Sequence, residues 1–225
     1  MFIVPGLILF ARMEQRRAHG TSLAAALPIA AAGLLTYVAY KNVDWWATIC
    51  LVAGTLPGTL IGTRLLSSIN RRVLSWSFVI VALTSALRLL FGFGASEPTT
   101  HSFSLTGILV LVGFVTGVLS GLLGIGGGIV MVPALMMLGG VSAVIAKGTS
   151  LAVIVPTSVI GTWRNRRLAN VDLRAGLTTG IAGSGTAVVG GIVAEMLPER
   201  VAVATYALLM VVVCSRLVLA QRTWH

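Results

Sequence analysis

Apolar segments of about twenty residues alternate with short polar segments along most of the chain. Segments of that length and composition are typical of helices that cross a membrane. The pattern therefore predicts an all-α, polytopic membrane protein. The predicted spans are 21–40, 45–66, 73–91, 103–123, 144–162, 175–196 and 201–220. The first apolar run, 1–11, is too short to span comfortably.

A glycine cluster interrupts the pattern after the span at 103–123. Gly124 and then Gly126, Gly127 and Gly128 precede a short apolar segment, about 128–138, which contains Pro133. Glycine is a poor helix former and readily adopts positive φ, so we predict a broken helix here. Irregular backbone at membrane depth is tolerated where it is buried in protein or lines a cavity, and transporters tend to bind substrates at such breaks. Close helix packing through small residues is the alternative.

The chain repeats itself without a gap, in the register that aligns Pro5 with Pro133. The same register aligns Gly-Thr-Ser-Leu-Ala at 20–24 with the identical block at 148–152, and Pro28 with Pro156. It also aligns Asn-Val-Asp at 42–44 with Asn170, Val171 and Asp172. We predict two repeats, 1–97 and 98–225, that form one integral membrane domain and use these prolines and the Asn-Val-Asp loops as structural elements.

The first repeat has no counterpart of the glycine-rich helix at 107–128, because Met1 aligns with Ile129. We expect that the chain is an N-terminally incomplete fragment, or that its start has been assigned too late.

Charge bears on orientation more than on binding partners. The chain is 56% hydrophobic and 10% charged, with a net charge of +10. The basic residues lie between apolar segments, which favours topology and contact with anionic lipid over nucleic-acid binding. The basic loops, 12–19 and 64–72 in one copy and 163–174 in the other, are out of phase. Under the positive-inside rule this predicts repeats of opposite orientation, a common transporter plan, provided that the short helix at about 128–138 counts as a crossing. A re-entrant helix there would make the repeats parallel.

Hydroxyl groups occur at matching positions in both copies, as Thr21 and Ser22 and as Thr149 and Ser150. Such hydroxyls can donate to a substrate oxygen, or they can bond to their own helix. Lys147 precedes the second pair and would either add positive potential or extend to the interface. With the N–H groups of Gly126–Gly128 at the positive end of a helix dipole, these residues form a candidate anion site.

The positions of the acidic residues also favour an anionic substrate. All of them fall in loops or at the ends of spans, whereas proton and cation relays usually need a carboxylate within the membrane. They are Glu14, Asp44, Glu97, Asp172, Glu195 and Glu199.

The sequence carries no nucleotide-binding or metalloprotease motif and no cluster of Cys and His ligands. We therefore expect no enzyme activity, no cofactor and no metal. Cys50 and Cys214 both lie in apolar segments and are interpreted as packing residues.

Three stretches together resemble the sulfite exporter TauE/SafE family. They are 120–133, which holds the glycine cluster, Ala-Lys-Gly-Thr-Ser-Leu at 146–151, and 169–172 with its Asn-Val-Asp. The resemblance covers nearly the whole chain and departs from the family in the missing first glycine-rich helix. It implies a permease of the bacterial inner membrane that exports sulfite, a sulfonate or a related sulfur anion. A non-transporting remnant or assembly subunit, and a permease for a neutral or cationic solute, are the alternatives.

Overall fold

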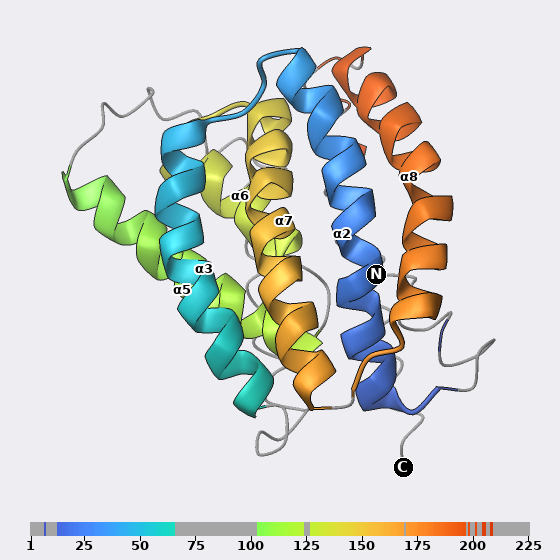
Figure 1. The fold of residues 1–225 in the computed structure, drawn as a ribbon. Coiled ribbons are helices and arrows are strands. Elements are labelled where there is room, and N and C mark those ends of the chain that lie inside the picture. Colours follow the sequence, from blue (N-terminus) through green and yellow to red (C-terminus); the bar gives the residue numbers. More distant parts are fainter. Residues whose placement is uncertain are drawn as a thin grey trace.

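The structure is a computed structural model of the 225-residue chain, and it describes residue 7, residues 13–65, 103–123, 127–168 and 170–196, and isolated positions between 198 and 208. The regular structure in these parts is helical (Figure 1). The elements are α2 (Gln15–Ala39), α3 (Trp45–Leu65), α5 (Phe103–Leu123), α6 (Gly128–Leu138), α7 (Ala143–Arg167) and α8 (Leu173–Met196).

Four of the described helices, α2, α3, α7 and α8, are long and apolar enough to cross a membrane. By the same measure the part of α5 from Thr106 to Leu122 is a shorter apolar helix. The predicted all-α, polytopic membrane architecture is therefore confirmed. The predicted spans at 73–91 and 201–220, and Pro5, fall outside the part of the chain that the structure describes, apart from isolated positions in the second span.

Two helices are longer than the apolar pattern predicts. α2 begins at Gln15, well before the predicted span, and α7 continues to Arg167. A hydropathy pattern marks the part of a helix that lies in hydrocarbon, about twenty residues. Beyond it, Gln and Arg are good helix formers. In the last turn of α7, moreover, three arginines lie near the negative end of the helix dipole.

Helices α2 and α7 lie side by side and run in opposite directions (Figure 1). A Cβ atom at Gly33 would lie 3.2 Å from Leu151, and one at Gly161 would lie 3.0 Å from Leu23. A later position on α2 thus contacts an earlier position on α7, so the two helices are antiparallel. The repeat register aligns Gly33 with Gly161 and Leu23 with Leu151, so the two contacts are counterparts, and Pro28 lies midway between the two α2 positions.

Helices α3 and α5 pack closely through glycines on both sides. A Cβ atom at Gly54, Gly58 or Gly62 would overlap the carbonyl oxygen of Val110, Phe114 or Val118, respectively. Later positions on α3 contact later positions on α5, so the two helices run parallel. Small residues at four-residue spacing are what permits helix backbones to approach this closely in a membrane.

The apolar core lies between α3, α5, α6 and α7. Its buried members come from all four helices, and α6, the short helix after the glycine cluster, is therefore held inside the bundle. They are Ala47, Cys50, Leu51, Leu109, Met131, Val132, Leu135, Ala146 and Val153.

Candidate functional site

The start of α6 is the irregular point that the glycine cluster predicts. Gly127 has φ 74°, in the left-handed region, and it is the N-cap of α6. The N–H groups of Val130 and Met131 both donate to the Gly127 carbonyl, at 3.1 and 3.2 Å. The intrahelical bonds of α6 therefore begin at Gly127, and the positive end of the α6 dipole lies at this residue.

Residues of α5 and α7 surround this helix start. A Cβ atom at Gly127 would lie 3.5 Å from the Cβ atom of Ser120 on α5. One at Gly128 would lie 3.7 Å from the hydroxyl of Ser150 and 3.0 Å from Ile154, both on α7. The structure thus brings together three of the predicted site residues, Gly127, Gly128 and Ser150. Gly124 and Gly126 fall outside the described residues.

Ser120 is a member of this site that the sequence analysis did not select. It is 1% exposed, and its hydroxyl has no hydrogen-bond partner among the residues that the structure describes. A buried hydroxyl without a partner is unfavourable by about 1–3 kcal/mol. Its signal in the sequence is its place one helical turn before the glycine cluster, but that position alone does not separate it from an ordinary packing serine.

Ser150 and Ser22 make the same local bond in the two repeats. The Ser150 hydroxyl donates to the Lys147 carbonyl at 2.8 Å, and the Ser22 hydroxyl donates to the His19 carbonyl at 2.8 Å. Both serines are buried. A hydroxyl that donates within its helix still has lone pairs, and it can turn to donate to a ligand instead. Lys147 is half-buried and lies one turn before Ser150.

The two threonines of the repeated motif bind backbone in the opposite repeat. Thr21 accepts a hydrogen bond from the backbone N–H of Asp172 at 3.0 Å, and Thr149 accepts one from the N–H of Asp44 at 2.9 Å. Both threonine side chains are fully buried. We call these two bonds the Thr–Asp latches. The repeat register aligns the threonine of each latch with the threonine of the other, and likewise the aspartates.

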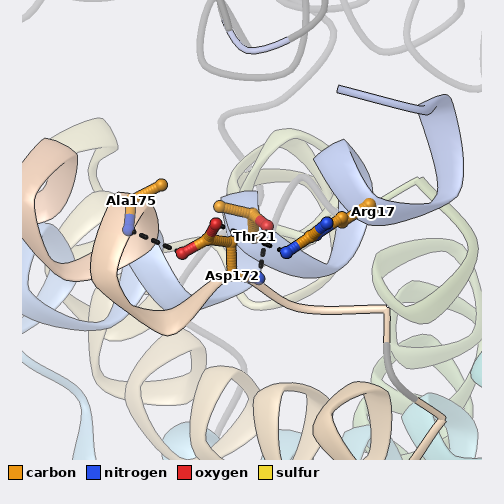
Figure 2. A network of polar contacts seen from close by, with 4 residues as sticks. All are labelled: Arg17, Thr21, Asp172 and Ala175. Atoms are coloured by element: carbon orange, nitrogen blue, oxygen red, sulfur yellow. Dashed lines mark hydrogen bonds and ion pairs between the residues drawn. The ribbon is translucent and has the colours of Figure 1, made fainter. Parts of the chain in front are cut away.

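Each latched aspartate also caps the helix that follows it. The Asp172 carboxylate accepts from the N–H of Ala175 at 3.0 Å, as Figure 2 shows, and Asp44 accepts likewise from Ala47 at 3.0 Å. Arg17 adds an ion pair to Asp172 at 3.5 Å. Its counterpart in the second repeat is Ile145, which cannot form an ion pair with Asp44.

The latches lie at opposite ends of the packed pair α2 and α7, because those helices are antiparallel. Leu23 on α2 packs against Gly161 on α7. Because the helices are antiparallel, Thr21 on α2 lies beside position 163 of α7, far along that helix from Thr149. The rise of 1.5 Å per residue makes this separation about 21 Å. Thr21 and Ser22 are therefore not part of the cluster around Gly127.

The arrangement at Gly127 offers hydrogen-bond donors and a positive dipole to a ligand, without a carboxylate among the groups placed there. Among the described residues, no three His, Cys, Asp or Glu side chains gather into a potential metal site. A broken helix, held inside a bundle of membrane-length helices, defines a polytopic membrane protein of the transporter type.

The family follows from comparison with known proteins. The profile described as "Sulfite exporter TauE/SafE" matches residues 1–101 and 109–225, and the chain belongs to this family. It is 31% identical to the "Probable membrane transporter protein YunE" of Bacillus subtilis over 72% of this chain. It is 26% identical to a "Probable membrane transporter protein" of Xylella fastidiosa over 92% of this chain and 80% of that protein.

The match spans only part of some relatives. It covers 65% of the Bacillus subtilis protein. It covers 30% of a "Probable membrane transporter protein" of Methanocaldococcus jannaschii, at 35% identity. No solved structure matches this chain.

Proposed function

We propose that this protein transports a small anion across the membrane and binds it at the N-terminus of α6. The observation that carries the proposal is the left-handed Gly127 at the start of a buried helix, beside Ser120, whose hydroxyl has no partner in the described part of the chain. The N-terminus of a helix attracts negative charge through its dipole and its first N–H groups. A buried hydroxyl with no acceptor adds a donor at the same point.

The acidic residues favour an anion over a cation. Asp44 and Asp172 cap α3 and α8 at the ends of the helix bundle, where their carboxylates accept backbone N–H groups. Glu14 is exposed just before α2. Lys147 is half-buried on α7, in the same helical turn as Ser150, and adds positive potential on the α7 side of the site.

Alternating access is supported by the antiparallel packing of α2 and α7. These helices are counterparts in the two repeats, yet they run in opposite directions. A two-fold axis perpendicular to the helices would relate them, so we infer that the two repeats have opposite orientations in the membrane. Rocking of one repeat against the other would then expose the site to each side in turn.

We propose a sulfur oxyanion, sulfite or a sulfonate, as the substrate and the plasma membrane as the location. The name of the family supports the substrate. Sulfite and sulfonates present several oxygens that accept hydrogen bonds, which suits backbone N–H groups and serine hydroxyls.

The test is efflux of sulfite from proteoliposomes that contain the purified chain. Gly127→Leu should abolish efflux, because a side chain at φ 74° is strained and its Cβ atom would lie only 3.3 Å from the Thr116 carbonyl oxygen. Gly107→Leu is the matched control, since a Cβ atom there meets nothing within 4 Å. Efflux that survives Gly127→Leu would overturn the site. Transport of a neutral or cationic solute without sulfite transport would overturn the substrate class, and no transport of any solute would favour a non-transporting role.

A further inference from the structure

Helix α7 carries a row of enclosed polar side chains beyond its contact with α6. The members are Ser158, Thr162 and Asn165, which are spaced by four and three residues and therefore lie on one face of the helix. Ser158 is 0% exposed and Asn165 is 2% exposed, whereas Thr162 is half-buried. We call these three residues the α7 polar row.

The side-chain oxygens of the α7 polar row are buried and lack hydrogen-bond partners. In the described part of the chain, no group bonds to the Ser158 Oγ, the Thr162 Oγ1 or the Asn165 Oδ1, and the Nε atom of Arg164 beside them is unpaired as well. The other buried side-chain atom of the described residues in this state is the Ser120 Oγ, beside the start of α6. A buried polar atom without a partner is unfavourable, and native proteins keep few of them. Their concentration in one stretch of α7 indicates a place for a polar ligand.

The hydroxyls of the row differ from those that bond to their own helix. Thr157, next to Ser158, donates to the Val153 carbonyl at 2.7 Å. The same bond to the preceding turn is open to any serine or threonine within a helix. Ser158 and Thr162 do not make it with any described residue, so each hydroxyl keeps its hydrogen for another acceptor.

The fold does not require polar side chains at this place. The repeat register aligns the α7 polar row, in order, with Ala30, Leu34 and Tyr37 on α2. The first repeat therefore fills the same helix face with apolar and aromatic side chains, and Ala30 and Tyr37 are buried there. The polar version belongs to the second repeat, which also holds the start of α6.

The α7 polar row continues the helix face that touches the candidate anion site. A Cβ atom at Gly128 would lie 3.0 Å from Ile154, and Ser158 follows Ile154 by one helical turn on the same face. From Ser158 to Asn165 the row covers about 10 Å of the helix axis, at 1.5 Å per residue. It leads to the last turn of α7, which carries three arginines. Under the positive-inside rule that end of α7 is cytoplasmic.

We propose that the α7 polar row is the path along which the anion moves between the cytoplasm and the start of α6. This inference rests on the proposed function, because the anion site at α6 is one end of the path. Ser158 and Thr162 each offer a hydroxyl to an anion oxygen, and the Arg164 guanidinium supplies positive charge near the cytoplasmic end. The Asn165 amide nitrogen donates to the Gly161 carbonyl at 2.9 Å, so its free oxygen accepts from water that hydrates the anion.

The path is closed in this conformation, because Ser158 and Asn165 are buried. Leu23 on α2 packs against Gly161, which lies between these two residues on α7. Movement of α2 away from α7 at this contact would uncover the row. Such a movement is what rocking of one repeat against the other would produce.

The first test measures binding and transport of sulfite in the same variants. The double variant Ser158→Ala, Thr162→Val removes both hydroxyls with little change of shape. It should slow sulfite efflux from proteoliposomes at least tenfold, while the Kd for sulfite, from isothermal titration, stays within twofold of the parent value. Thr157→Val is the matched control, because it removes a neighbouring hydroxyl that bonds to its own helix, and it should keep the parent rate.

The outcomes of this test separate the path from the site. A parent protein that neither binds nor transports sulfite would refute the proposed function, and the path with it. A parent that transports sulfite no faster than the double variant would overturn the path alone. Equal loss of efflux in Thr157→Val would show a general effect of packing, and a weakened Kd in the double variant would place its hydroxyls in the α6 site; either result overturns the path.

Cysteine labelling tests the path without measuring transport. Ser158→Cys, in a chain that also carries Cys50→Ala and Cys214→Ala, is treated in sealed vesicles of either orientation with a methanethiosulfonate reagent that bears a sulfonate group. It should react from the cytoplasmic side, and faster than with a trimethylammonium reagent once each rate is divided by that of a free thiol. Val153→Cys is the matched control, because Val153 is equally buried on another face of α7, and it should react at least tenfold more slowly. Equal rates at both positions, no reaction at either, or a preference for the cationic reagent would overturn the path.

The charge of Arg164 gives a further arm of the labelling test. Arg164→Gln should lower the preference of Ser158→Cys for the anionic reagent at least threefold. Arg166→Gln is the matched control, because it makes the same charge change at an exposed position in the same turn. Equal effects of the two substitutions would show that the preference comes from the basic helix end as a whole, which would overturn the assignment of Arg164 to the path.

Discussion

Replacing Thr21 by valine removes one Thr–Asp latch while keeping the shape of the side chain. Thr21 is fully buried, and its hydroxyl accepts from the Asp172 N–H at 3.0 Å. Leaving a buried N–H without an acceptor costs about 1–3 kcal/mol. Interhelical hydrogen bonds in membrane proteins are worth about 0.6 kcal/mol on average and up to about 1.7 kcal/mol. Because Thr21 is fully enclosed, we expect a loss of about 1–1.7 kcal/mol in the free energy of unfolding.

The repeat supplies an internal duplicate of this measurement. Thr149→Val removes the other latch, which has the same geometry at 2.9 Å, and should cost a similar amount. The two latches lie about 21 Å apart along α7 by its rise per residue, so the double variant should lose the sum of the two. Thr21→Ser keeps the acceptor and should restore most of the stability.

Unfolding in mixed detergent micelles, followed by the fluorescence of the five tryptophans, measures these differences. Thr178→Val is the control, because that threonine is exposed and donates only to carbonyls of its own helix. It should change the free energy of unfolding by less than about 0.5 kcal/mol. A Thr21→Val variant as stable as the Thr178→Val control, or a Thr21→Ser variant as unstable as Thr21→Val, would refute the latch as a source of stability.

Two further changes separate packing from charge. Gly58→Leu should prevent folding, because even a Cβ atom at this position would overlap the Phe114 carbonyl oxygen. Size-exclusion chromatography after normal membrane insertion should then show that the monodisperse peak is lost. A folded Gly58→Leu variant would contradict the close α3–α5 contact. Arg17→Ala should lower the free energy of unfolding by less than about 1 kcal/mol, because the ion pair to Asp172 is largely exposed. The difference in stability between Arg17→Ala and the parent should shrink in concentrated salt. A larger loss of stability that does not depend on salt would show that Arg17 acts through packing instead.

The hydropathy pattern predicted the spans well where a helix lies wholly in hydrocarbon. The end of α3 and both ends of α5 and α6 agree with the prediction to within a residue. It failed at Gln15 and at Arg167, where polar residues continue a helix into the interface. Hydropathy reports whether a segment is apolar enough to lie in hydrocarbon. At Gln15 and Arg167 the helix extends beyond the apolar segment, so hydropathy does not mark where the helix begins or ends.

The candidate site was predictable in part. Glycine conformation is a local property, so the break at Gly127 followed from sequence. The repeat showed that Thr21 and Thr149 are equivalent, but it did not show which groups they face. Their partners, Asp172 and Asp44, lie 151 and 105 residues away, and only the packing of the helices brings them together. Ser120 was missed for the same reason.

Binding of sulfite to the purified chain is the most direct test of the anion site at α6. A hydrogen bond to a charged group contributes about 1.5–3 kcal/mol, so Ser120→Ala should weaken binding by about ten- to a hundredfold. Ser184→Ala, on α8, whose hydroxyl donates to the Gly180 carbonyl of its own helix, should leave the Kd unchanged. Isothermal titration of both variants gives the comparison. An unchanged Kd for Ser120→Ala, in protein that folds as the parent does, would contradict an anion site at the start of α6.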